Sequence, residues 1–184
     1  MLSNSSPALS IVPVLETARL IMRGYRAADY PAFLAMHQEP AFYRYLSPAP
    51  MAQEEVWKTL LRSAGHWALL GYGFWALEEK ATGRFVGGVG YLHLKRDLDP
   101  PLGDAPEMGW VLAAGAHGQG YASEAVAAAI AWGDAYFQHA RTVCLIDPEN
   151  LPSLRVAEKF GFREYARVAY HGEPVILLER PGKP

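Results

Sequence analysis

One short segment, residues 116–125 (AHGQGYASEA), constrains the fold more than any other, because it places two glycines directly before the strongest helix pattern. That helix is predicted over residues 121–137, where apolar side chains recur every three or four positions. A strand is predicted just upstream, at Glu107–Leu112 (EMGWVL). Glycines between a strand and a helix start can bring several backbone N–H groups together at the positive end of the helix dipole. Two glycines alone more often mark an ordinary turn, so the surrounding sequence must decide.

The rest of the chain alternates strand and helix patterns and predicts a mixed α/β fold, with helices covering a mixed sheet. Further strands are predicted at residues 17–23, 73–78, 84–94, Thr142–Ile146, 162–170 and 175–180, the last two forming a hairpin. Further helices are predicted at residues 28–37, 52–64 and 152–160, with Gly65 as the stop of the second. Residues 41–51 hold several aromatic side chains without a regular period, which indicates a packed surface loop.

Length and composition predict a single domain. A chain of 184 residues with 51% hydrophobic residues can bury one sizeable core, assigned here to residues 15–184 after a flexible N-terminal tail at residues 1–14. The tail has no positively charged segment before its apolar residues, and no stretch approaches the roughly 20 apolar residues of a membrane span. We therefore expect a cytoplasmic protein that does not contact a membrane.

Charge and ligand-forming residues exclude several classes of function. The net charge is −2 and no stripe of Lys or Arg is present, so nucleic acid is not an expected partner. The histidines show no metal-ligand spacing, and no metal is expected. The single cysteine, Cys144, lies in an apolar strand and is interpreted as a buried structural residue rather than a nucleophile.

Two interpretations of the glycine segment as a binding site compete. In a dinucleotide-binding fingerprint the glycines follow the strand at once, whereas five residues separate Leu112 from Gly118 here, and the chain leaves no room for a second half-fold. A different context comes from downstream, where Asn150, Ser153 and Ala157 share one face at the start of a helix. Asn150 is a candidate cap for that helix.

These segments resemble the GNAT N-acetyltransferases. H-G-Q-G-Y-A, at residues 117–122, looks like the family's acetyl-CoA motif Q/R-x-x-G-x-G/A. N-L-P-S-L-R-V-A-E-K-F-G-F, at residues 150–162, looks like the N-x-x-S-x-x-x-x-E-K-x-G-F segment of the RimJ/RimL-like branch, and E-T-A-R-L-I-M-R is similar to that branch's first strand. The resemblance covers roughly residues 15–179. It implies a central, mostly antiparallel twisted sheet with two splayed strands, flanked by helices.

The resemblance also implies acetyl-CoA as the co-substrate, held mainly by main chain between the strands Glu107–Leu112 and Thr142–Ile146. His117 stands where the motif usually has Gln or Arg, and Ala157 stands where many members carry a tyrosine that protonates the leaving thiolate. The implied cofactor-binding residues are Trp110, Val111, Leu112, His117, Gly118, Gln119, Gly120, Tyr121, Ala122, Asn150, Ser153 and Arg155.

The implied reaction is acetyl transfer to a primary amine by direct attack in a ternary complex. Glu107 is the candidate base, acting directly or through water, although a simple exposed strand-end carboxylate is an equally good interpretation. The N–H of Val111 or Leu112 would stabilise the oxyanion, and Ser153 or a water would return a proton to the CoA sulfur.

The acceptor is less constrained. Candidate walls of its pocket are Phe33, Tyr43, Tyr45 and Tyr170, and acidic residues in the central loop, together with Glu107, give a negative bias suited to a cationic amine unless that loop is merely solvated. The sequence is compatible with a protein N-terminus, such as that of a ribosomal protein, or with a small-molecule amine. It is also compatible with a monomer or a homodimer. His117 and Ala157 leave open a different function, a catalytically idle acyl-CoA sensor.

Overall fold

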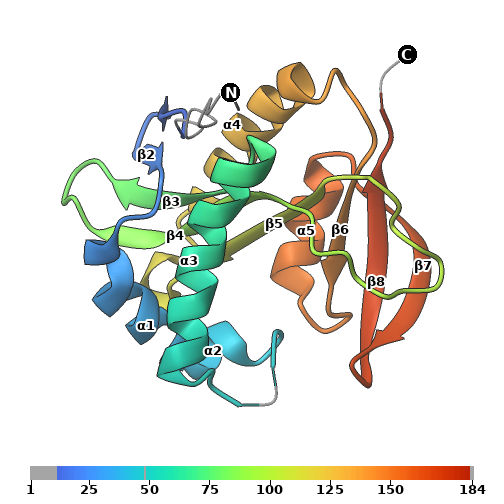
Figure 1. The fold of residues 1–184 in the computed structure, drawn as a ribbon, viewed down its shortest axis with the longest axis horizontal. Coiled ribbons are helices and arrows are strands. Elements are labelled where there is room, and N and C mark those ends of the chain that lie inside the picture. The colour runs from blue at the N-terminus through green and yellow to red at the C-terminus, as the bar shows by residue number, and fades with distance from the viewer. Residues whose placement is uncertain (1–11, 48, 183–184) are drawn as a thin grey trace, which may run out of the picture.

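A single sheet organises the molecule. The computed structural model describes residues 12–47 and 49–182 (Figure 1). Within them, eight strands form one sheet in the order β1-β2-β3-β4-β5-β6-β8-β7, antiparallel at every step except β5 to β6. The strands are β1 (Leu15–Glu16), β2 (Leu20–Arg23), β3 (Phe74–Glu79), β4 (Phe85–Leu92), β5 (Glu107–Leu112), β6 (Thr142–Ile146), β7 (Arg163–Tyr170) and β8 (Glu173–Arg180). The mostly antiparallel mixed sheet is therefore confirmed.

Helices cover both faces of this sheet (Figure 1). They are α1 (Tyr30–Gln38), α2 (Pro40–Tyr43), α3 (Gln53–Leu70), α4 (Tyr121–Tyr136) and α5 (Leu151–Lys159). Side chains alternate across β3, so that Ala76 packs with the α1–α3 cluster while Trp75 and Leu77 pack with α4. Two hydrophobic cores result, one on each face. No helix in the described part of the chain combines the length and the apolar character that crossing a bilayer requires.

Three local predictions differ from the structure. The strand predicted at residues 17–23 is split, because Thr17 N–H donates to the Leu20 carbonyl (3.0 Å) and closes a turn between β1 and β2. The helix predicted to stop at Gly65 continues to Leu70 and ends at Gly71, whose φ of 75° is the left-handed cap that suits glycine. The loop predicted at residues 41–51 contains most of a short helix, α2, which Pro40 begins.

The longer α3 has a clear physical cause. Trp67 lies two residues beyond Gly65 and is only 2% exposed. Its indole N–H donates to the Phe74 carbonyl (2.9 Å), which ties the last turns of the helix to the start of β3. Burial of this large side chain outweighs the small helix penalty of one glycine.

The N-terminal tail proposed for residues 1–14 lies mostly outside the described residues. Of those described, Val12 packs against the core on the α4 face. The Pro13 carbonyl accepts a hydrogen bond from the indole of Trp75 (2.8 Å). Ordered contacts with the domain thus begin before residue 15.

Two glycines inside helices should respond oppositely to alanine. A Cβ at Gly65 would meet nothing within 4 Å, so Gly65→Ala should stabilise the fold by about 0.5–1 kcal/mol through helix propensity. A Cβ at Gly133 would lie 2.6 Å from Cζ of the buried Tyr91, so Gly133→Ala should destabilise it by about 1–3 kcal/mol. Urea unfolding of both variants measures this, and a higher midpoint for Gly133→Ala would contradict the packing described here.

Candidate active site

The segment between β5 and α4 is built to present bare amides. A short 3-10 turn, Ala114–Ala116, follows β5, and the chain then reaches Gly118 and Gly120 with φ of 73° and 81°. Both values lie in the left-handed region that glycine adopts without strain. Glu124 N–H donates to the Gly120 carbonyl (3.1 Å). The N–H groups that precede it at the start of the helix therefore have no carbonyl partner within the helix. Such amides, at the positive end of α4, are able to bind a phosphate group.

Beside this loop, β5 and β6 separate. Their parallel pairing is confined to Glu107 opposite Val143, and Val143 N–H donates to the Pro106 carbonyl (3.1 Å). Beyond that point the two strands diverge. The remaining length of β5 therefore has a backbone edge that faces an opening instead of a neighbouring strand.

The register of β5 decides which amides face the opening. On its other side β5 pairs with β4, and Ala113 N–H donates to the Val86 carbonyl (3.0 Å). Hydrogen-bonded positions alternate along an antiparallel pair, so the N–H of Val111 also points to β4. The N–H groups of Trp110 and Leu112 point to the opening. The Leu112 carbonyl is already engaged, since it lies 3.0 Å from Nε2 of His117.

A cavity of about 520 Å³ occupies this opening. Its size is typical of a site for a cofactor-sized ligand. The cavity is lined by the end of β5, the glycine loop, the starts of α4 and α5, and the segment at α2, through Ala41, Phe42, Arg44, Tyr45 and Leu46. Arg44 and Arg155 contribute positive charge, and no Asp or Glu lines it among the described residues. An anionic ligand is therefore favoured.

A second, smaller cavity of about 260 Å³ lies at the other end of β5. Glu107 lines this cavity and not the larger one. The Glu107 side chain is nearly buried, with the residue 8% exposed, and its two oxygens accept hydrogen bonds from Nε and Nη2 of Arg96 (2.7 and 2.8 Å). The Arg96 guanidinium in turn lies over the Tyr170 ring, 4.8 Å from its centroid.

Charges of both signs surround the second cavity. Lys95 and Arg96 line it, against the single carboxylate of Glu107. Nearby on α3, the pKa of the Arg62 guanidinium is lowered, first by desolvation and then by the charge of Arg96. The negative charge of Glu107 acts on the pKa of Arg62 in the opposite direction. Among the lining side chains the charge of Glu107 is thus offset, while the negative bias expected of the loop rests on its exposed aspartates, Asp97, Asp99 and Asp104.

Comparison with known proteins identifies this arrangement. A family model described as an acetyltransferase (GNAT) domain matches residues 19–163. The chain belongs to the GNAT acetyltransferase family. The glycine loop is one of the segments by which the sequence resembled that family, and the separation of β5 and β6 is what the resemblance implied. The resemblance is confirmed.

Several relatives of this GNAT domain share its fold. A putative GNAT-family acetyltransferase from Bordetella pertussis is 32% identical, with a TM-score of 0.80 over 91% of this chain and 99% of that one. An acetyltransferase from Agrobacterium tumefaciens str. C58 is 27% identical, with a TM-score of 0.77 over 91% and 94% of the two chains. RimL, a ribosomal L7/L12 alpha-N-protein acetyltransferase solved in complex with coenzyme A, is 20% identical, with a TM-score of 0.72 over 93% and 97% of the two chains, and shares the fold.

Among curated sequences, YkkB of Bacillus subtilis (strain 168) is 34% identical over 112 residues. The match covers 60% of this chain and 63% of YkkB, so the chain spans less than two thirds of that relative. A second relative from the same organism, the N-acetyltransferase YnaD, is 40% identical over 57 residues, which are 31% of this chain and 34% of YnaD.

The GNAT domain brings most of the predicted cofactor-binding residues to the larger cavity. All of them line it except Gln119. Gln119 lies on the outer side of the loop, where its side-chain amide donates to the Gly115 carbonyl (2.8 Å). Asn150 caps α5 as predicted, because its side chain accepts the Ser153 N–H (3.2 Å). The roles of these residues in binding remain predictions.

The four predicted acceptor residues are not brought together. Tyr45 lines the larger cavity, whereas Tyr170 lies under Arg96 beside the smaller one. Phe33 is 2% exposed and belongs to the core between α1 and the sheet, and Tyr43 packs against that same core. The aromatic spacing that suggested a common wall arises partly from core packing.

Some site residues escaped the sequence analysis. Arg44 and Ser123 line the larger cavity, and Arg96 holds Glu107 in the smaller one. Arg44 lies in the segment predicted to be a loop, where no periodic pattern indicates which side chains face the cavity. Arg96 lies eleven residues from Glu107 across an irregular connection, a separation with no periodic signal.

Two further residues limit the chemistry of this GNAT domain. Cys144 is 2% exposed, and burial raises the pKa of its thiol, which confirms the structural interpretation and disfavours an acyl-enzyme. Ala157 is fully buried in the core and brings no polar group. Ser153 is the remaining hydroxyl on that face of α5 and lines the larger cavity.

Proposed function

We propose that this chain transfers the acetyl group of acetyl-CoA to a primary amine by direct attack in a ternary complex. The observation that carries the proposal is the larger cavity, which joins unpaired helix-start amides, two arginines and a free strand edge. In this proposal the amides around Gly118–Ala122 hold the pyrophosphate. Backbone groups of Trp110 and Leu112 hydrogen-bond the pantetheine arm and direct the thioester toward the point where β5 and β6 meet.

The amine enters from the smaller cavity, beside Glu107. An amine with a pKa of about 8 to 10 is protonated at neutral pH and must lose a proton before its nitrogen attacks the thioester. Each Glu107 oxygen has two lone pairs and uses one of them to accept a hydrogen bond from Arg96, so a bound water can still donate a hydrogen bond to the carboxylate. Glu107 thus acts through water, and Arg96 holds the carboxylate in place.

Collapse of the tetrahedral intermediate, which expels the CoA thiolate, needs less assistance from the protein than deprotonation of the amine. The N–H of Leu112, which faces the opening, is the donor assigned to the oxyanion in place of Val111. The CoA thiol has a parent pKa of about 8.5, so it leaves as a thiolate with little assistance. Ser153 or a water then returns the proton to sulfur.

The charges of the smaller cavity favour an acceptor that carries an anionic group near its amine. Among the charged side chains that line it, Lys95 and Arg96 outweigh Glu107, and the exposed aspartates of the same loop (Asp97, Asp99 and Asp104) lie outside the lining. This balance disfavours a polyamine and suits an amino acid or the N-terminus of an acidic peptide. A protein N-terminus, as in the ribosomal-protein acetyltransferases that share the fold, remains a candidate of the same chemical kind.

Acetyl-CoA-dependent release of free CoA thiol tests the function. Amino acids, acidic peptides, ribosomal proteins and spermidine are offered at equal concentration. Release should be fastest with an acceptor that bears a carboxylate, by at least about tenfold over spermidine, since a single charge contact is worth roughly 1–3 kcal/mol. Fastest release with spermidine would contradict the assigned acceptor class.

An idle acyl-CoA sensor is the second candidate. It is favoured by one observation, that Arg96 already occupies both oxygens of Glu107. Tight binding of acetyl-CoA without CoA release from any amine or protein would establish it in place of the enzyme.

A further inference from the structure

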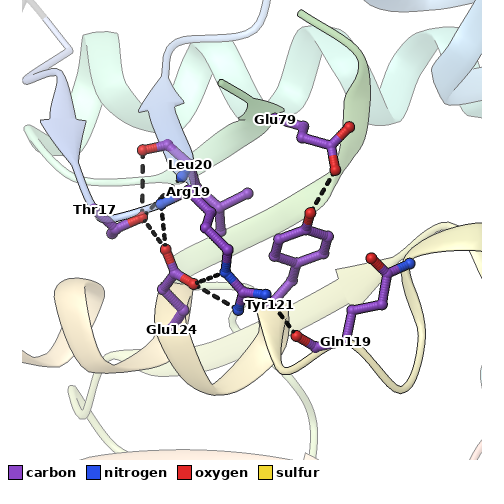
Figure 2. A network of polar contacts seen from close by, with 7 residues as sticks. All are labelled: Thr17, Arg19, Leu20, Glu79, Gln119, Tyr121 and Glu124. Carbon is purple, nitrogen blue, oxygen red and sulfur yellow. Dashed lines mark hydrogen bonds and ion pairs between the residues drawn. The ribbon is translucent and has the colours of Figure 1, made fainter. Parts of the chain in front are cut away.

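A polar network outside the cavity holds the glycine loop from behind (Figure 2). Its centre is Glu124, in the first turn of α4, and its other half is the turn between β1 and β2, about a hundred residues earlier in the chain. The Thr17 hydroxyl donates to Glu124 Oε1 (2.6 Å), and the Arg19 backbone N–H donates to the same oxygen (2.8 Å). Arg19 Nε donates to Oε2 (2.7 Å), and Nη2 lies 2.7 Å from Oε2 as well.

Arg19 also reaches the loop itself. Its Nη1 donates to the Gln119 carbonyl (2.8 Å), directly between the two left-handed glycines. The Arg19 guanidinium lies over the ring of Tyr121, 4.4 Å from its centroid, and the Tyr121 hydroxyl donates to Glu79. Figure 2 shows the Arg19 side chain extending between Glu124 and Gln119, next to the Tyr121 ring. One side chain therefore contacts the loop, the first residue of the helix and its first turn.

Two physical consequences follow. A glycine loop has more backbone freedom than any other, so its amides converge on a ligand only if the loop is held. In addition, the charge of Glu124 lies in the same helix turn that receives the pyrophosphate, where it would repel the ligand. Burial would raise the pKa of Glu124, but the hydrogen bonds from Thr17 and Arg19 hold it below its usual value, so the carboxylate is charged and needs a cation beside it.

We infer that Arg19 is a positioning residue for the cofactor loop, which fixes the Gln119 carbonyl and neutralises Glu124 although it does not line the cavity. The inference rests on the proposed binding of acetyl-CoA at this loop. Arg19 acts through Gln119 and Glu124. Removal of its side chain therefore has two separable effects: the loop is no longer held at Gln119, and the negative charge of Glu124 is no longer neutralised.

Four proteins separate these effects: the wild type, Arg19→Met, Glu124→Gln and the double variant. Met keeps an apolar stem against Tyr121 but removes the charge and the donors. Calorimetric titration with CoA should show a dissociation constant raised about ten- to hundredfold in Arg19→Met and only a few-fold in Glu124→Gln. The double variant should bind more tightly than Arg19→Met, because it carries no unpaired carboxylate. With acetyl-CoA and an accepted amine, KM for acetyl-CoA should rise while kcat at saturation changes less than about threefold.

Control variants make the outcome decisive. Arg167→Met removes an exposed arginine that pairs with Glu164 on β7, far from the loop, and should leave CoA binding unchanged. Arg19→Lys keeps the charge beside Glu124 without the forked contact to Gln119, so its affinity for CoA should lie between those of the wild type and Arg19→Met. It replaces Arg19→Met in the comparison if that variant does not fold. CoA affinity of Arg19→Met within twofold of wild type would overturn the inference, as would a double variant no tighter than Arg19→Met. A wild type that does not bind CoA would overturn the cofactor assignment itself.

Discussion

Gly120→Ile is expected to abolish the thermal stabilisation that acetyl-CoA confers on the wild type. Gly120 has a φ of 81° and is the N-cap of α4, so a branched side chain is strained there and should displace the amides assigned to the pyrophosphate; its Cβ would lie 3.5 Å from Nη2 of Arg19. A ligand at a hundred times its dissociation constant stabilises by about 2.7 kcal/mol, which is roughly 5–10 °C for a chain of this size. That shift in melting temperature is the quantity to measure.

The matched control is Gly83→Ile. Gly83 has a φ of 70° in the turn between β3 and β4, and a Cβ there would meet nothing within 4 Å. The backbone strain is therefore similar, while the cavity is untouched. Gly83→Ile should melt at a lower temperature without ligand yet keep the full shift with acetyl-CoA. A full shift in Gly120→Ile would locate the phosphate site elsewhere.

Glu107→Gln is expected to lower kcat by roughly 10²–10⁴ with little change in KM for acetyl-CoA. The amide cannot take up a proton, and general-base assistance is worth about that factor. The KM should hold because Glu107 does not line the larger cavity. Steady-state kinetics with an accepted amine, across pH, measure both quantities.

Stability must be followed in the same variant. The change leaves Arg96 without a charged partner in a half-buried site, so part of any loss of activity could come from unfolding. Glu179→Gln is the control, since Glu179 on β8 pairs with Arg141 (2.6 Å), the residue before β6, and lines neither cavity. Wild-type kcat in a folded Glu107→Gln protein would remove Glu107 from the mechanism.

Local patterns made the cofactor side of the site predictable. Gly118 and Gly120 lie between a strand pattern and an apolar-faced helix pattern. Together these patterns predicted a strand, a loop and a helix start within twenty residues, and the structure contains all three. Asn150 could likewise be placed as a cap from its position before α5. These features depend on backbone conformation and nearest neighbours, which sequence spacing reports directly.

Long-range pairing was not predictable in the same way. Arg19 contacts Glu124 across 105 residues, and Arg96 meets Glu107 through an irregular loop. Both pairs depend on how separate elements meet in the sheet. The predicted end of α3 was wrong for a related reason. Gly65 is an ordinary helix stop signal, but burial of Trp67 against the start of β3 keeps the helix going beyond it, and sequence spacing does not report that contact. The four residues predicted to form the acceptor pocket come from separate elements and are not brought together, so the position of that pocket stays a prediction.

Calorimetric titration of the wild type with CoA and with pantetheine tests the central claim most directly. Pantetheine retains the arm assigned to the β5 edge but lacks the pyrophosphate assigned to the glycine loop. If the loop amides bind the pyrophosphate, CoA should bind at least about a hundredfold more tightly, a difference of roughly 2.7 kcal/mol. Equal affinities for the two ligands would contradict the account.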